Sequence, residues 1–316
     1  MAKDIPLKRI LLAAIIILGV VFRIWASQPT WIHWDENFYI NIFQNFVDRG
    51  ELTPYMWRLG NDTNIISGAG TGYGIFILIG WMTIFGESLF GVRMLMVLAG
   101  LVTTWVYYLI SKQWWESREA GIAAMTFGIV STSAFYTLVG RMDALAILSY
   151  SLLLFLHIVA VRQVKKWPHF WVGAVSILST EIHILGLLYV GSLAIYYGFR
   201  YVEIVSRERK LMLDSYPVYF FCGAGIFGVL YVIIHILPDP QAYFLIPTTC
   251  SICESSFLQT EINRIQRFIT FRPLDSFLVI VISAFAIKSR ERYRHFSILF
   301  VGYIGVQIIA KPPSFV

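Results

Sequence analysis

Long apolar runs separated by short charged clusters dominate the pattern of this chain. A helix needs roughly 17–25 apolar residues to cross a bilayer, and shorter runs are tolerated where the membrane is thin or protein lines the helix. Runs that meet this description lie at about 10–27, 92–111, 119–138, 144–161, 217–237, 274–288 and 296–310. The pattern predicts an all-α polytopic membrane protein.

Two further apolar regions do not fit one crossing each. Residues 73–86 are short, and residues 170–199 are too long for one ordinary span and too short for two full ones. Lys and Arg accumulate in cytoplasmic loops, so their distribution indicates how many times each of these two regions crosses the membrane. Most of the 25 Lys and Arg lie on the cytoplasmic side if the N-terminus is cytoplasmic, 73–86 dips without crossing, and 170–199 crosses twice. We therefore predict about nine spans.

This topology leaves two long loops on the extracytoplasmic side, at 28–91 and 238–273. The first contains an amphipathic stretch, Glu36 to Val47, whose apolar positions recur with a helical period. Such a helix is expected to lie along the membrane interface. The short pair at 170–199 is expected to turn at Thr180-Glu181-Ile182-His183. We predict a single transmembrane domain over residues 1–316.

Composition supports the membrane class and narrows the function. Hydrophobic residues make up 57% of the chain and charged residues 14%, whereas a soluble protein has about 25% charged residues. The formal net charge of +6 arises from short basic clusters between apolar runs, which argues against a nucleic-acid-binding surface. Three cysteines provide no disulfide framework, although Cys250 and Cys253 could close a small disulfide or be incidental.

Asp35 and Glu36 are the most informative polar residues, because they follow the first apolar run directly. Desolvation disfavours charged carboxylates at a membrane surface, so two in succession require a partner, water or a chemical role. Capping of a helix would need only one of them. The adjacency therefore predicts a functional role for Asp35.

Other polar residues fall on the same predicted outer face. Asp143 begins a span, and Glu181 and His183 lie in the turn of the short pair. Shortened spans allow polar groups to reach a cavity at membrane depth. Structural alternatives exist for each: Asp143 as a helix cap, Arg141 as its surface partner, and His183 and Glu181 as solvated polar groups. The remaining members of the group are His33 and Arg58.

In order and spacing, these motifs resemble the GT-C glycosyltransferases, specifically the family 39-like branch of protein O-mannosyltransferases and aminoarabinose transferases. The first motif is Trp34-Asp35-Glu36-Asn37-Phe38-Tyr39. The second is Phe85-Gly86-Glu87-Ser88-Leu89-Phe90-Gly91-Val92-Arg93, and the third is Gly140-Arg141-Met142-Asp143-Ala144-Leu145. The resemblance covers residues 8–165 by motif and the rest by topology. Where many relatives carry a Pro-Pro-Leu stretch, this chain has Gly70-Thr71-Gly72-Tyr73-Gly74.

The resemblance implies a GT-C-like bundle that transfers a sugar from a polyprenyl-phosphate carrier to an acceptor hydroxyl on the extracytoplasmic face. It implies that Asp35 is the catalytic base of an inverting transfer, with Glu36 beside it and Asp143 as a second acidic element. Cationic groups would stabilise the departing lipid phosphate. The expected substrate-binding residues are Arg58, Arg141, His183, Glu181, Tyr39 and Lys311. Relatives are usually longer, which implies either a C-terminally truncated chain or a minimal form.

Some relatives hold a divalent cation near the acidic pair, so a Mg²⁺ or Mn²⁺ site formed by Asp35, Glu36 and His33 is a further expectation. The implied partners are a lipid-linked sugar donor, membrane lipid, and a protein, lipid or glycan acceptor, in the plasma membrane or its equivalent. Two alternatives stay open, namely a transporter and a non-catalytic membrane scaffold. A transporter would need polar groups near the bilayer midplane and related halves, and the sequence shows no internal repeat.

Overall fold

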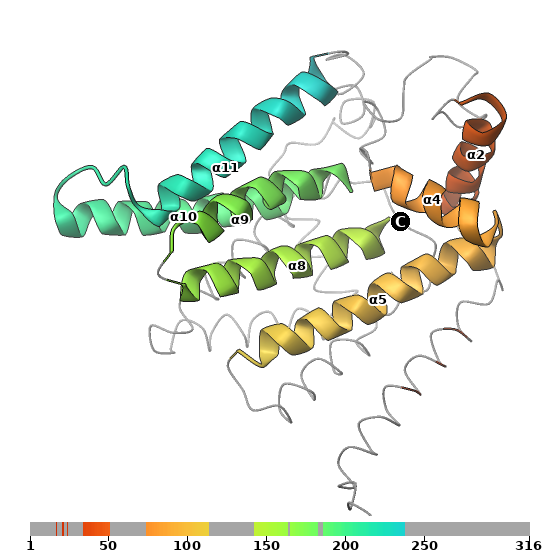
Figure 1. The fold of residues 1–316 in the computed structure, drawn as a ribbon, viewed down its shortest axis with the longest axis horizontal. Helices are drawn as coiled ribbons and strands as arrows, with labels where there is room; N and C mark the ends of the chain where they lie inside the picture. Colours follow the sequence, from red (N-terminus) through yellow and green to blue (C-terminus); the bar gives the residue numbers. More distant parts are fainter. Residues whose placement is uncertain are drawn as a thin grey trace, which may run out of the picture. The chain divides into compact units, whose positions relative to one another are not determined.

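The computed structural model describes residues 34–50, 74–113, 142–163, 165–182 and 186–237, with isolated helical positions at Ile17, Val21 and Ile24 (Figure 1). All elements in these ranges are helices. The predicted spans at 119–138, 274–288 and 296–310 and most of the span at 10–27 lie outside the described residues. The all-helical prediction is therefore confirmed for the described part, and the nine crossings stay a prediction.

The chain divides into two compact units, which are described separately. The first unit comprises residues up to Val164 together with Ser179–Ile184, and the second comprises Lys165–Leu178 and the chain from Leu185 onward. Three described helices are long and apolar enough to cross a membrane. They are Leu89–Ser111, Asp143–Arg162 and Tyr216–Ile236, and each agrees within three residues with a predicted span.

One apolar core joins the helices of the first unit. These are α2 (Trp34–Arg49), α4 (Ile75–Phe85), α5 (Leu89–Ser111) and α8 (Asp143–Arg162), followed by the short 3₁₀ turn η3 (Ser179–Glu181). Among the fully buried members of the core are Ile42 of α2, Leu78 of α4, Met96 of α5 and Met142, which directly precedes α8. The core thus packs α2 and α4, which belong to the predicted first outer loop, against the beginnings of the spans α5 and α8.

Helix α2 corresponds to the predicted amphipathic stretch, but its apolar face packs against protein. Ile42 is 0% exposed and Phe43 is 8% exposed, and both belong to the core shared with α4 and α5. Phe46 meets Phe76 of α4 edge to face, with ring centroids 6.1 Å apart. The predicted helix is confirmed. Ile42 and Phe43 are covered by neighbouring helices, so they do not provide the membrane-facing surface that we expected, whereas Val47 near the end of the helix is 62% exposed.

Helix α4 is a short separate element within the predicted dipping segment. Its 11 residues rise about 16 Å, roughly half of the hydrocarbon thickness of a bilayer. It ends at Gly86, whose φ of 87° is a conformation that favours glycine. Ser88 then caps α5 by accepting a hydrogen bond from the Gly91 amide at 3.0 Å. A length this short supports the prediction that this segment does not cross.

Helices α5 and α8 lie side by side and run in the same direction (Figure 1). Their first halves meet in the core, where Met96 and Leu145 are members of one cluster. At their other ends, the Arg162 guanidinium donates to the side-chain oxygen of Gln113 at 2.6 Å. The predicted topology requires this shared direction, because it places a returning span between the two.

The second unit contains α9 (Trp167–Leu178), α10 (Gly186–Glu208), α11 (Tyr216–Tyr231) and a π-helical turn η4 (Val232–Ile236). The helix is interrupted at η3, where the turn of the short pair was predicted, and the double crossing stays a prediction. Helix α10 continues beyond the predicted limit of residue 199, because Glu203 pairs along the helix with Arg200 and with Arg207. Ion pairs at these spacings allow a helix to extend past the end of its apolar sequence.

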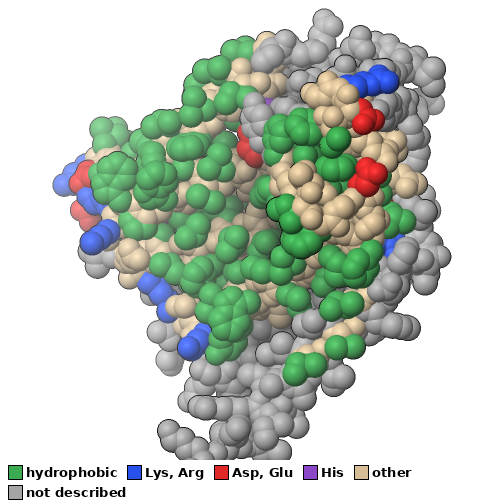
Figure 2. Space-filling view, turned by 45° about the vertical axis from the view of Figure 1, so that its right-hand side comes forward, with side chains coloured by type: hydrophobic (Ala, Val, Ile, Leu, Met, Phe, Trp, Pro, Cys, Tyr) green, Lys and Arg blue, Asp and Glu red, His purple; other side chains and the backbone are tan. Residues whose placement is uncertain are grey.

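Hydrophobic side chains cover much of the described surface (Figure 2). Trp105 of α5 is 60% exposed and Val229 of α11 is 60% exposed, although both lie in long apolar helices. Such side chains would be unfavourable in water over so large an area. Their exposure is what helices in contact with lipid require.

Candidate functional site

A buried ion pair joins α2 to α5 in the first unit. Nε of Arg93 donates to Oε1 of Glu36 at 2.6 Å, and Nη2 donates to Oε2 at 2.8 Å. The Arg93 side chain is 3% exposed and the Glu36 side chain is 0% exposed. Two parallel hydrogen bonds match the planar guanidinium to the carboxylate and give the contact a fixed geometry. Both oxygens of Glu36 are thus engaged by one cation.

The local sequence explains why each partner needs the other. Arg93 lies in the first turns of an otherwise apolar helix, where an unpaired charge would be costly. Glu36 lies in the first turn of α2, where a carboxylate interacts favourably with the helix dipole but still requires a hydrogen-bonding partner when buried. Sequence reasoning named Arg93 only as the last residue of the second motif and assigned it no role. Its position in the second motif, inside an apolar run, was the signal that could have identified it.

Asp35 precedes Glu36 in the first turn of α2. The backbone of Asp35 is described, and its side chain lies outside the described set. Glu36 is directed to Arg93. The catalytic role of Asp35 stays a prediction, and the structure fixes the backbone from which its side chain leaves.

Asp143 is the first residue of α8 and is partly buried. Its neighbours Met142 and Ala144 are 0% and 1% exposed and belong to the same core as α2. The N-cap position is occupied by Met142, without a side-chain hydrogen bond. Asp143 is thus the residue after the assigned N-cap, its place in the first turn suits the helix dipole, and both its structural and its catalytic roles stay predictions.

Glu181 and Tyr39 also belong to this unit. Glu181 ends η3 and is half-buried, and Ile182 beside it packs against the core. A β-carbon on Gly74 would lie 2.6 Å from the carbonyl oxygen of Glu181, so the start of α4 and this turn are in direct backbone contact. Tyr39 is 7% exposed, within the core, one helical turn after Glu36. Acidic groups from three segments of the sequence thus belong to one compact unit.

The other predicted site residues lie outside the part of the chain that the structure describes. These are His33, Arg58, Arg141, His183 and Lys311. Within the described residues, no group of three or more His, Cys, Asp or Glu side chains forms a candidate metal site. Glu36 does not fit as a ligand, because both of its oxygens accept hydrogen bonds from a guanidinium whose charge disfavours a neighbouring cation.

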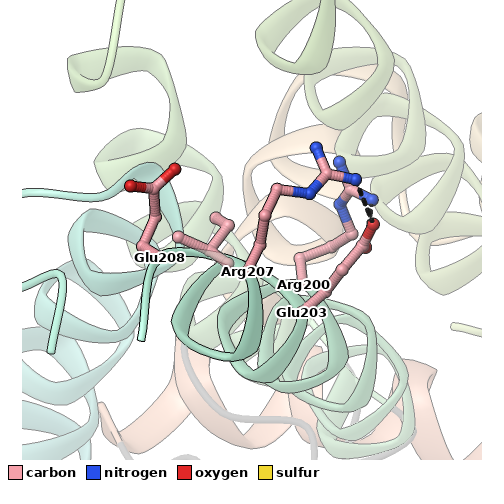
Figure 3. Close-up of a pocket in the computed structure, with 5 residues that line it drawn as sticks. Arg200, Glu203, Arg207 and Glu208 are labelled. Carbon is pink, nitrogen blue, oxygen red and sulfur yellow. Dashed lines mark hydrogen bonds and ion pairs between the residues drawn. The ribbon is translucent and has the colours of Figure 1, made fainter. Parts of the chain in front are cut away.

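The second unit has a small hollow at the C-terminal end of α10 (Figure 3). Its charged lining alternates in sign, and Glu203 pairs with both Arg200 and Arg207. Nε of Arg200 also donates to the hydroxyl of Tyr216 at 2.8 Å. These contacts compensate the charges within the helix and between neighbouring helices. The hollow therefore has the character of a solvated helix end and not of an acid–base site.

Residues 73–223 match the family model described as dolichyl-phosphate-mannose-protein mannosyltransferase. The matched region is just under half of the chain and includes Arg93, Asp143 and Glu181. It begins after α2, so Asp35 and Glu36 precede it. No curated protein and no solved structure matches. The predicted resemblance to the GT-C glycosyltransferases is confirmed over this region.

Proposed function

Because residues 73–223 carry the sequence pattern of a membrane mannosyltransferase family, we propose that this protein transfers a sugar from a polyprenyl-phosphate donor to an acceptor hydroxyl. The acceptor oxygen attacks the anomeric carbon, and the bond from that carbon to the phosphate oxygen breaks. Polyprenyl phosphate leaves with the electron pair, and the hydroxyl proton passes to a base. A dolichyl-phosphate mannose donor and a protein acceptor are the substrates to test first, because the family description names them.

The observation that carries this proposal is that α2, through Tyr39, Ile42 and Phe43, and the first turn of α8 pack into one core. Each turn bears a carboxylate from the motifs, Asp35 on α2 and Asp143 on α8. Asp35 is the general base, since Glu36 beside it is held by Arg93. A base acting on the acceptor during a single displacement gives inversion at the anomeric carbon. Asp143 is the second acidic group of the same site.

Around these carboxylates we assign binding roles by charge and chemistry. Arg58, Arg141 and Lys311 stabilise the lipid phosphate as its negative charge develops. Tyr39, His183 and Glu181 orient the sugar and the acceptor by hydrogen bonds. A divalent Mg²⁺ or Mn²⁺ ion beside Asp35 and His33 belongs to the proposal and would supply further charge stabilisation when bound. The site faces the extracytoplasmic side of the plasma membrane or its equivalent, with the N-terminus cytoplasmic.

The proposal is tested with the purified full chain in lipid nanodiscs, radiolabelled dolichyl-phosphate mannose and a serine- and threonine-rich peptide. Loss of a general base lowers such a rate about 10²–10⁴-fold, and we expect Asp35→Asn to fall in this range. Asp48→Asn, at the other end of the same helix, is the matched control and should retain activity. Near-normal transfer by Asp35→Asn would contradict the assignment of the base. Solute flux without any lipid-linked sugar would favour a transporter instead.

A further inference from the structure

We infer that Arg93 is a positioning residue, which holds Glu36 so that the first turn of α2 presents Asp35 to the reacting hydroxyl. The inference rests on the proposed function and deepens it, because it gives two adjacent carboxylates different roles. Asp35 exchanges a proton with the substrate. Glu36 neither exchanges a proton nor binds a metal ion, and serves as the anchor by which α5 fixes the rotation of α2.

The geometry of the contact supports this role. The ion pair joins residues 57 positions apart in the sequence and uses two hydrogen bonds, of 2.6 and 2.8 Å. Apolar side chains of α2 such as Ile42 also contact the core, and apolar contacts fix distance more than direction. A bidentate pair, in contrast, fixes the carboxylate in a plane. Since Asp35 is covalently adjacent to Glu36, rotation of α2 would carry Asp35 away from its substrate.

The energetics of buried ion pairs support a role of this pair in orienting α2. Desolvation of two charges offsets much of their attraction, so replacing a buried ion pair by apolar residues of similar size is often neutral for stability or even stabilising. Removal of only one partner is strongly destabilising, because it leaves a buried charge uncompensated. An ion pair that contributes little net stability can still be required for the reaction, because it fixes the orientation of α2. Misplacement of a reacting group by about 1 Å can reduce a rate 10²-fold.

The decisive variant is therefore the double substitution Glu36→Met with Arg93→Met, which removes the pair without leaving a buried charge. We expect a melting temperature in nanodiscs close to that of the wild type, and a kcat reduced at least about tenfold. The KM for the lipid-linked sugar should be unchanged. The exchange Glu36→Arg with Arg93→Glu restores the pair in reverse and should recover part of the kcat. Arg162→Met, which breaks an exposed contact at the far end of α5 and α8, is the control.

Each other outcome overturns the inference. A double variant with wild-type kcat would show that the pair has no part in catalysis, and one that does not fold would show that the pair is needed for the fold. A raised KM with unchanged kcat would show that Arg93 contacts the donor directly. A second measurement does not depend on sugar transfer. It therefore distinguishes failure of this inference from failure of the proposed function.

That measurement is the labelling rate of Asp35→Cys by a membrane-impermeant maleimide, in a background where Cys222, Cys250 and Cys253 are serine. The inference predicts different labelling rates with and without the Glu36–Arg93 pair. Equal rates would mean that the pair does not control the position of residue 35. An inactive wild type with pair-dependent labelling would instead contradict only the proposed function.

Discussion

A β-carbon on Gly74 would lie 2.5 Å from the Cα atom of Ile182. Such a distance is not compatible with any side chain at residue 74, because the Cα atom of Ile182 belongs to the backbone and cannot rotate away. The contact joins the start of α4, in the predicted first outer loop, to the turn that carries Glu181. Both segments belong to the unit in which we place the site, so the absence of a side chain at residue 74 determines how closely they approach.

We expect Gly74→Ala to destabilise the first unit by about 1–3 kcal/mol, the usual cost of forcing extra atoms into a packed region. Sugar transfer should also fall, since Glu181 would be displaced. Gly80→Ala, one to two turns later in α4, is the control, because a β-carbon there would meet no atom within 4 Å. That substitution should be neutral or slightly stabilising. Thermal unfolding in nanodiscs measures both variants, and equal melting temperatures would contradict the contact.

A second glycine contact allows a prediction for the other unit alone. A β-carbon on Gly173 of α9 would lie 2.1 Å from the carbonyl oxygen of Phe220, and one on Gly223 of α11 equally close to the carbonyl oxygen of Phe170. The two helices cross with their backbones in contact, as small residues permit in membranes. Gly173→Ala should therefore lower the melting temperature markedly. Gly225→Ala, where a β-carbon would find open space, should not, and a similar loss in both would argue against this crossing.

The fold was predictable where hydropathy and length determine the element. The spans expected at 92–111, 144–161 and 217–237 correspond to the helices Leu89–Ser111, Asp143–Arg162 and Tyr216–Ile236. The turn expected near Thr180 also corresponds to η3. A long apolar run has few alternatives in a membrane, because every backbone polar group must be satisfied within the helix. These elements therefore follow from local sequence.

The partners of polar residues were not predictable in the same way. Nothing in the local sequence indicates that Glu36 will meet Arg93, because the hydropathy pattern specifies a face and a period without specifying a partner. The apolar face of α2 illustrates the same limit, since Ile42 could have faced lipid or protein and is fully buried in protein. For the candidate site, the sequence identified the acidic residues, and the structure adds the arginine that holds one of them.

Asp143 provides a prediction that separates chemistry from helix capping. Because Met142 occupies the N-cap of α8, Asp143→Asn leaves the cap residue in place, and the weakened helix-dipole interaction costs about 0.3–1 kcal/mol. As a second acidic group of the site, it should nevertheless be needed for transfer. We expect a rate reduced by about 10²-fold, typical of a lost proton-transfer or charge-stabilising group, with a nearly unchanged melting temperature. Glu87→Gln, an exposed neighbour of the α5 cap, is the control, and equal activity of both variants would exclude Asp143 from the chemistry.

The loop between α10 and α11 predicts a dependence of stability on pH. Asp214 accepts hydrogen bonds from Lys166 and from the Tyr219 hydroxyl. The hydrogen bond and the charge of Lys166 hold the pKa of Asp214 below its usual value of 3.8. A carboxylate whose pKa is lowered by folding contributes stability above its unfolded pKa, and this contribution is lost as the pH falls through its folded pKa. The side chain is exposed, so the effect should be small and screened by salt.

We therefore expect Lys166→Met to lower the melting temperature slightly at pH 7, and the difference from the wild type to disappear in acid, once Asp214 is protonated in both proteins. The same difference should shrink at high ionic strength, because salt screens exposed ion pairs. Lys165→Met is the matched control, since the pair with Asp214 is made by Lys166. Melting temperatures measured across the acidic range at low and high salt test the pair. A difference that persists unchanged below the folded pKa would mean that Lys166 stabilises the unit through packing of its aliphatic chain, and not through Asp214.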